Sequence, residues 1–434
     1  MPFASVDEHG TVLYYEDSGP PQGDHVDVYT TAVLIHGTYW NGGIFRKILP
    51  LGPEHGLRII TLNQRGFVSS TPLSAPELAQ LTSNSQNERL RYLKNRAREI
   101  AKFLIWIIEN ENIPPFYCSD GVPVAVGRIR SDLRGGVSLV AWSSGNHLAL
   151  PFFAYGREFL STHEQSLLGR YVRSYVMYDS PPDTSGMPLP KVGETYLCPI
   201  HDPVKVVKPE VAQTFPTWVS SYSSHSHKLL DALSSIFHAS ATPSHLVQSP
   251  DGHGPLVGLS DAYVLNGVAI EADKSISPSI TRLPAEATEP SESVVRFHIP
   301  VVLIGEGAYK RVLYKALFGD FVSTTNIDED LRGEVAQGEL TGTDPLWLPE
   351  VKMEVVVCGR SSSICIWNAW KLYDLVRDRP LGIAPQCIAG GQSRGAATSG
   401  GTQRSVCFHM WRDFNHFPHW DNPQEYMKLL AGVV

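Results

Sequence analysis

The sequence predicts an α/β fold in which a mostly parallel sheet is flanked by helices and interrupted by a large insertion. Short apolar runs that end in polar or glycine residues alternate with a helical pattern through the first 180 residues. The same alternation returns after about residue 345, and the stretch between is rich in Pro, Ser and His. With 434 residues and 42% apolar content, the chain is long enough for a large core.

Each predicted element rests on a local pattern. Before the insertion, four apolar runs predict buried parallel strands, at 30–37, 57–66, 135–143 and 171–179. Between the second and third, residues 87–112 repeat apolar side chains at helical spacing. After the insertion, strands are expected at 351–359 and 404–411, with a helix at 364–378 between them and a short helix at the end. The alternation of the first 19 residues also favours strands.

One apolar run is ambiguous. "IPVVLIGEGAY" (299–309) resembles a strand that ends at the carboxyl edge of a sheet, so it competes with 351–359 for one place. The later segment is favoured because a helix and the final strand follow it at ordinary distances.

The domain organisation follows from these patterns. We expect a first part of the core at 1–184, an inserted cap at 185–344 and the second part of the core at 345–434. By composition, 275–293 is a loose connector and 389–403 a Gly/Ser-rich surface loop.

Composition excludes several function classes. The net charge is -8 and no long basic run occurs, which argues against nucleic-acid binding. The six cysteines are scattered without a CxxC pair, so neither a disulfide framework nor a zinc site is expected. There is no signal-peptide pattern, apolar membrane span or N-x-S/T acceptor, and these absences favour a cytoplasmic protein.

No cofactor or metal is expected. The sequence lacks a phosphate-binding glycine loop, a dinucleotide fingerprint and an HExxH metal motif. The expected partner is a small-molecule substrate, and nothing in the sequence specifies an oligomeric state.

The stretch "AWSSG" (141–145) carries the first functional signal. A strand ends there in small-x-Ser-x-Gly, and a helical pattern follows. A serine on a sharp strand-to-helix turn needs small neighbours, because its backbone is strained and larger side chains would collide. Ser143 would then be an exposed nucleophile, whereas a serine that caps the helix is the structural alternative.

Four motifs together resemble the cap-bearing branch of the α/β-hydrolase superfamily. They are "LIHGTYWNGGIF" (34–45), "LNQRGFVSSTP" (62–72), "AWSSG" (141–145) and "DFNHFPHWDNPQEY" (413–426), in the order of that family. The resemblance covers about 10–184 and 345–434 and leaves the cap outside.

The resemblance implies roles for individual residues. Ser143 would be the nucleophile and His416 the general base, and the backbone NH groups of Thr38 and Ser144 would form the oxyanion hole. His36 and Gly37 would shape the oxyanion turn, and Gly145 would allow the elbow; a packed histidine at the strand end is the alternative for His36. Two rival bases remain open, His419 in "HFPHW" and His409 within the last predicted strand.

The acid of the triad departs from the commonest pattern of the family. After the strand 351–359 the chain reads "CGRSSSIC", with no carboxylate. Some family members instead take the acid from the preceding core strand, and Asp179 stands there, with Asp183 second and Glu306 third. For Asp179, a turn residue before two prolines is the alternative.

These residues predict a serine hydrolase that cleaves an ester, a lactone or a thioester through an acyl-enzyme. A serine at the elbow argues against the carboxylate-dependent epoxide hydrolases and dehalogenases of the same superfamily. The aromatic content of 214–230 suggests a bulky apolar substrate. Two alternatives stay open: a carbon–carbon bond hydrolase of a diketone, and a non-catalytic protein that binds a small ligand.

Overall fold

The main sheet carries the fold. The computed structural model describes residues 2–22, 28–118, 133–190, 199, 208–240, 259–269, 271–290, 293, 295–296, 299–304, 306–319, 346–377 and 404–434. Within these residues the sheet has eight strands in the order β1-β2-β4-β3-β7-β8-β9-β10. The pairs β1–β2 and β2–β4 are antiparallel, and the pairs from β4 to β10 are parallel. The strands are β1 (Phe3–Ser5), β2 (Val12–Asp17), β3 (Thr30–Ile35), β4 (Leu57–Leu62), β7 (Val137–Trp142), β8 (Val172–Tyr178), β9 (Lys352–Cys358) and β10 (Val406–Trp411). The predicted α/β class is confirmed.

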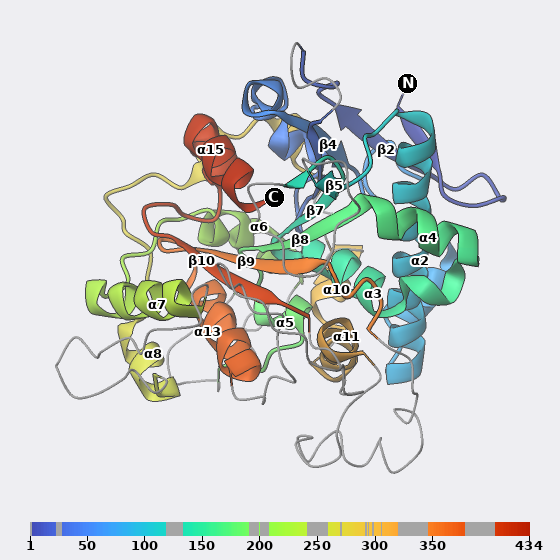
Figure 1. The fold of residues 1–434 in the computed structure, drawn as a ribbon. Helices are drawn as coiled ribbons and strands as arrows, with labels where there is room; N and C mark the ends of the chain where they lie inside the picture. The colour runs from blue at the N-terminus through green and yellow to red at the C-terminus, as the bar shows by residue number, and fades with distance from the viewer. Residues whose placement is uncertain are drawn as a thin grey trace, which may run out of the picture.

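Helices cover both faces of the sheet. In Figure 1, α15 and α6 lie on one side of it, and α11 and α13 lie on the other. A separate two-stranded pair joins β5 (Tyr117–Cys118) and β6 (Leu133–Arg134). The helices of the core are α1 (Ala75–Leu81), α2 (Gln86–Asn110), α3 (Asn146–Tyr155), α4 (Thr162–Tyr171), α5 (Pro182–Ser185), α13 (Ser363–Arg377), α14 (Pro418–Asp421) and α15 (Pro423–Val433). Those of the expected cap are α6 (Lys208–Val219), α7 (His227–Ser240), α8 (Asp261–Gly267), α10 (Ile299–Val302) and α11 (Glu306–Phe318).

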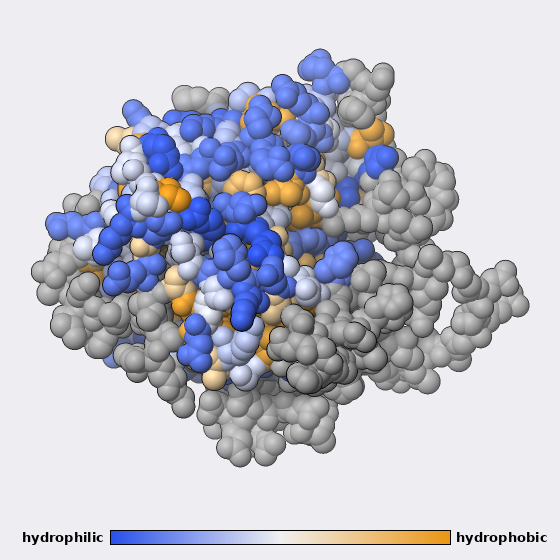
Figure 2. All heavy atoms as spheres, turned by 90° about the vertical axis from the view of Figure 1, so that its left-hand side faces the viewer, coloured by the Kyte–Doolittle hydropathy of each residue, from blue (hydrophilic) through white to orange (hydrophobic). Residues whose placement is uncertain are grey.

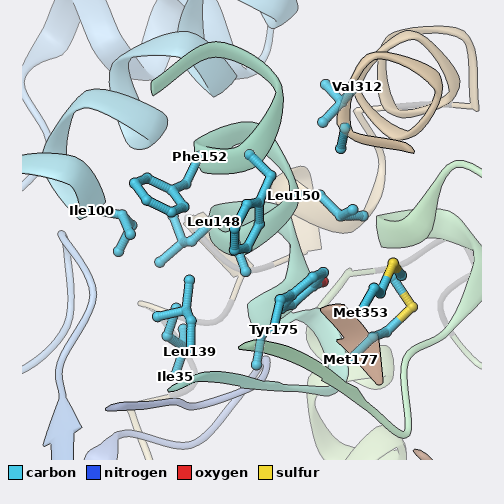
Figure 3. Close-up of a cluster of buried hydrophobic side chains, with 14 of the residues drawn as sticks. Ile35, Ile100, Leu139, Leu148, Leu150, Phe152, Tyr175, Met177, Val312 and Met353 are labelled. Atoms are coloured by element: carbon cyan, nitrogen blue, oxygen red, sulfur yellow. The ribbon is translucent and has the colours of Figure 1, made fainter. Parts of the chain in front are cut away.

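Both faces of the central strands are buried, which explains their continuous apolar runs. Alternate residues of β3 enter different clusters: Val33 and Ile35 pack on the α2 and α3 side, and Ala32 and Leu34 on the α15 side. Figure 3 shows side chains of α3 standing over residues of the central strands, with Ile100 of α2 and Val312 of α11 at the margins. The core therefore holds the carboxyl ends of β3, β7, β8 and β9 rigidly.

The described residues on one face of the molecule are largely polar. On the face drawn in Figure 2, hydrophilic residues prevail and the hydrophobic ones form smaller groups among them. None of the described helices combines the length and the apolar character that crossing a bilayer requires.

The preference for 351–359 over 299–309 is confirmed: 351–359 holds the sheet position as β9, and 299–309 contains α10 and the start of α11. One expectation for the insertion is corrected. Over its described part, 275–290, the expected loose connector contains short 3-10 turns at Ser279–Arg282 and Ala285–Ala287, and the backbone amide of Asn41 donates to the Ala287 carbonyl at 3.1 Å. The expected loop at 389–403 lies outside the described residues.

Candidate active site

The serine turn at the end of β7 has the geometry of a nucleophile elbow. Ser143 has φ +54, a left-handed conformation that costs a non-glycine residue roughly 1 kcal/mol or more. A Cβ on Gly145 would lie 2.7 Å from the carbonyl oxygen of His36, and a Cβ on Gly37 would lie 2.9 Å from the Cβ of Ser143. The side-chain NH₂ of Asn146 donates to the Ser143 carbonyl at 2.6 Å. Close backbone packing therefore holds the strained turn.

A buried histidine–carboxylate pair lies at the same edge of the sheet. Asp179 follows β8 with φ 47, and its Oδ2 is 2.5 Å from Nδ1 of His416, in the loop after β10. Both side chains are almost fully buried, at 0% and 1% exposed. Asp179, the first choice among the three carboxylates considered from the sequence, is hydrogen-bonded to His416. The contact fixes which ring nitrogen of His416 carries the proton, leaving Nε2 as an acceptor.

Two further donors hold the Asp179 carboxylate. The hydroxyl of Ser361 donates to Oδ2 at 2.6 Å, and the amide of Cys358 donates to Oδ1 at 3.0 Å. Ser361 lies just after β9, at the usual place of the acid, and its Oγ is also 3.4 Å from His416 Nδ1. Sequence reasoning missed Ser361, although "CGRSSSIC" offered a hydroxyl at the position where a carboxylate was sought.

His416 is fixed from both ends. The indole NH of Trp142 donates to the His416 carbonyl at 3.0 Å, and the two rings lie 4.9 Å apart. Its Nε2 is buried and has no hydrogen-bond partner among the described residues. Ser143 and His416 line the same cavity.

The remaining candidates make other contacts. His419 is buried among aromatic rings with its Nδ1 3.2 Å from the Tyr178 hydroxyl, and burial holds its pKa well below the ordinary value. His409 lies on β10, and its Nε2 is 2.8 Å from the carboxylate of Glu354 on β9. Asp183 lines the cavity from α5. Position 306 begins helix α11 and does not end a strand, so the basis for choosing Glu306 is removed.

The oxyanion turn is engaged by a side chain. The amide of Thr38 donates to the Ser144 hydroxyl at 2.5 Å, and the hydroxyls of Thr38 and Ser144 are also 2.5 Å apart. An oxyanion could reach the Thr38 amide only after the Ser144 side chain rotates. His36 below them is a fully buried neutral imidazole: burial lowers its pKa to about 3, and its Nε2 accepts from the Gln64 amide at 3.2 Å.

The cavity beside Ser143 is small. Its volume is about 30 Å³, and a single water needs roughly 10–15 Å³ on this measure. Core residues on its wall are Thr38, Ser143, Ser144 and His416, while the expected cap supplies Phe215, Trp218, Val219 and Val302. Phe215 and Trp218 of the aromatic segment therefore line the same cavity as Ser143, but in this conformation the space admits only a small group.

One set of side chains in the described part of the chain could be considered for a metal. Ligand atoms of Asp179, Cys365 and His416 lie within 4.8 Å of one another and all three residues are buried. The 2.5 Å contact between Asp179 and His416 leaves no room for an ion between them, and burial raises the pKa of the Cys365 thiol, which disfavours the thiolate that metals bind. The arrangement fits a proton relay better than a metal centre.

The chain order of these residues decides the fold family. A serine on a strand-to-helix elbow, an acid after the next strand and a late histidine follow one another as Ser143, Asp179 and His416 on a mostly parallel sheet. The chain has the α/β-hydrolase fold. The amides of Thr38 and Ser144 lie on the turns where the sequence predicts the oxyanion donors.

The comparisons with known proteins are limited to fold. No protein-family model matches the chain, and no curated protein matches it. Solved structures that match include a carboxylesterase of the thaumarchaeon Nitrososphaera gargenis, with 12% identity, TM-score 0.38, and 99% of this chain and 97% of that chain covered. An esterase from Exiguobacterium antarcticum has 12% identity, TM-score 0.36 and coverage of 99% and 98%. A laboratory-evolved potato epoxide hydrolase has 12% identity, TM-score 0.36, and 99% of this chain and 98% of that chain covered.

Proposed function

We propose that this protein is a serine hydrolase that cleaves a carboxylic ester, lactone or thioester through an acyl-enzyme. The observation that carries the proposal is the buried Asp179–His416 pair at 2.5 Å, since His416 and Ser143 line one cavity and Nε2 of His416 has no hydrogen-bond partner among the described residues. A paired imidazole next to a strained serine is the arrangement that activates a hydroxyl nucleophile. A missing carboxylate would favour the non-catalytic alternative, and the hydrogen bond between Asp179 and His416 supports the catalytic proposal instead.

The proposed reaction has two halves. Ser143 Oγ attacks the acyl carbon while His416 Nε2 takes the hydroxyl proton, and Asp179 stabilises the imidazolium without taking the proton. The tetrahedral oxyanion accepts hydrogen bonds from the amides of Thr38 and Ser144 once the Ser144 side chain has turned away from Thr38. His416 then protonates the leaving group, and water repeats the sequence to release the acid.

The substrate is bound between core and cap. We propose the division into 1–184, 185–344 and 345–434, because the cap residues Phe215, Trp218 and Val302 close the cavity over the elbow. The volume of about 30 Å³ favours a short acyl group on the Ser143 side. The bulky apolar substrate expected from the sequence would need α6 and α10 to move outward.

The proposal is tested by active-site labelling. The wild type is exposed to a fluorophosphonate and its intact mass is measured, and the adduct is located by peptide mapping. We expect one adduct on Ser143, none in Ser143→Ala, and slow labelling in His416→Ala. A folded wild type that forms no adduct, or forms it elsewhere, contradicts the proposal.

A further inference from the structure

A second cavity lies on the other side of the oxyanion turn. It has a volume of about 20 Å³ and shares Thr38 and Ser144 with the cavity that contains Ser143. Its walls are mostly apolar, with Leu62, Phe67 and Leu148 among them, and Arg96 of α2 enters it. The hydroxyls of Thr38 and Ser144, hydrogen-bonded at 2.5 Å, form the partition between the two spaces.

Arg96 has two buried donors with no partner. The residue is 1% exposed, and its Nε and Nη1 are without a hydrogen-bond partner among the described residues. Nη2 contacts Glu77 and, at 3.0 Å, Glu99, and the guanidinium carbon lies 4.8 Å from the centre of the Tyr92 ring. A buried NH that makes no hydrogen bond destabilises the folded state by about 1–3 kcal/mol, and by more when the group is charged. An acceptor atom bound in the cavity would remove this penalty.

The neighbouring Arg65 makes the contrast clear. Its Nε donates to the Thr71 carbonyl at 2.8 Å, Nη1 to Glu99 at 2.7 Å, and Nη2 to the Pro72 carbonyl at 2.8 Å and to Glu77 at 2.9 Å. All three nitrogens of Arg65 are used in holding the loop after β4. The unsatisfied donors therefore belong to Arg96 alone in this pair.

Charge balance selects an uncharged acceptor. Two arginines face two glutamates, and although burial opposes it, Arg96 and the hydrogen bonds of Ser74 lower the pKa of Glu77 to about 2. Burial raises the pKa of Glu99, while guanidinium groups at 2.7 and 3.0 Å favour its ionised form. A further carboxylate would leave an uncompensated buried negative charge, which is costly. The volume also suits one oxygen atom better than two.

We propose that the Arg96 cavity binds a second carbonyl oxygen in the acyl part of the substrate. This deepens the proposed function and rests on it. The reacting carbonyl lies at Ser143, the Thr38 and Ser144 side chains move to join the two cavities, and the distal carbonyl accepts hydrogen bonds from Arg96. The substrate class is an oxo-acyl compound, which includes the diketones that a carbon–carbon bond hydrolase would cleave.

Binding to the Ser143→Ala protein tests the subsite without turnover. Methyl esters of 3-oxo, 4-oxo and 5-oxo acids are titrated calorimetrically against the matching esters that lack the oxo group. We expect at least one oxo ester to bind at least tenfold more tightly than its match. Monomethyl glutarate, which carries a carboxylate, is expected to bind more weakly than that oxo ester.

Two substitutions in the Ser143→Ala background assign the effect. Arg96→Met is expected to reduce the preference to less than twofold, whereas Arg65→Met lowers thermal stability and leaves the preference intact. If Arg96→Met does not fold, Arg96→Lys keeps the charge opposite the glutamates, removes the guanidinium fork and is expected to lose the preference as well.

Several results would overturn the subsite: no preference in any pair, no binding of any ester, an equal preference in the Arg96 variant, or tighter binding of monomethyl glutarate. Failure of the proposed function is separate, because it is read from fluorophosphonate labelling of the wild type. Labelling at Ser143 without an oxo preference refutes the subsite alone.

Discussion

Replacing Asp179 with Asn should nearly abolish the reactivity of Ser143. The carboxylate accepts from His416 at 2.5 Å, Ser361 at 2.6 Å and the Cys358 amide at 3.0 Å, whereas an asparagine has one acceptor oxygen. The NH₂ group of the introduced asparagine must therefore face one of these three donors. If it faces Nδ1 of His416, it favours the tautomer with the proton on Nε2, and that nitrogen can then no longer accept the serine proton. A loss of about 10⁴-fold in labelling rate is expected, or about 5.5 kcal/mol at 1.36 kcal/mol per decade.

A second substitution should move the acid by one strand. Ser361 Oγ is 3.4 Å from His416 Nδ1, so the longer side chain of Ser361→Asp can bring a carboxylate oxygen to that nitrogen. In the Asp179→Asn background we expect it to restore labelling by about 10- to 100-fold, which is 1.4–2.7 kcal/mol.

The control is Ser361→Ala in the wild type, which removes one charge-assisted hydrogen bond and should slow labelling by about tenfold at most. The assay is the pseudo-first-order rate of fluorophosphonate labelling, with circular dichroism to verify folding. Unchanged labelling in folded Asp179→Asn would refute the assigned acid. A folded double variant no faster than Asp179→Asn would refute the geometric argument for Ser361.

Three further outcomes are expected. Gly145→Ala should cost about 2 kcal/mol or more in urea unfolding, because its Cβ would lie 2.7 Å from a carbonyl oxygen, whereas Gly432→Ala in α15, with open space around it, should stabilise by up to about 1 kcal/mol. Burial lowers the pKa of His36 to about 3 and of His147 to about 4, whereas both histidines have the ordinary pKa of 6.5 in the unfolded chain. Below pH 6.5 the unfolded chain therefore binds more protons than the folded protein. Stability should therefore be complete above pH 6.5 and fall toward pH 4, by up to about 1.4 kcal/mol per pH unit for each histidine, with a shallower urea-midpoint profile in His147→Gln. The carboxylate of Asp421 accepts hydrogen bonds from Tyr222 at 2.7 Å and from Ser279 at 2.5 Å, and so ties the segment after His416 to the expected cap. Asp421→Asn should weaken these bonds and lower both the melting temperature and the labelling rate. An unchanged labelling rate would show that the loop is held without them.

The sheet and the elbow were predictable because their signals are local. A parallel strand buried on both faces is mostly apolar, and a strained serine turn requires small neighbours, as Gly145 illustrates. The run 299–309 was ambiguous for the same reason: its apolar, β-branched residues suit a strand, but α10 packs them as a helix against α5 and the cavity.

Contacts between distant segments were not predictable. Ser361 becomes a partner of Asp179 only because β9 pairs with β8, and no spacing in the sequence encodes that bond. The Arg65 and Arg96 cluster likewise joins the loop after β4 to the middle of α2. Long-range side-chain pairs of this kind require the tertiary structure, since neither partner departs from an ordinary surface pattern.

The separation of Asp179 from His416 along the chain has a consequence for biosynthesis. The two residues are 237 positions apart, and closing a loop of that length costs about 5 kcal/mol in chain entropy. In the folded chain, the pairing of β9 with β8 and of β10 with β9 brings them together. A nascent chain that has emerged only as far as β8 already contains Ser143 and Asp179, yet under the proposed mechanism it lacks His416, the proposed base. Onset of labelling during refolding would therefore report the docking of the last strand, later than collapse or helix formation.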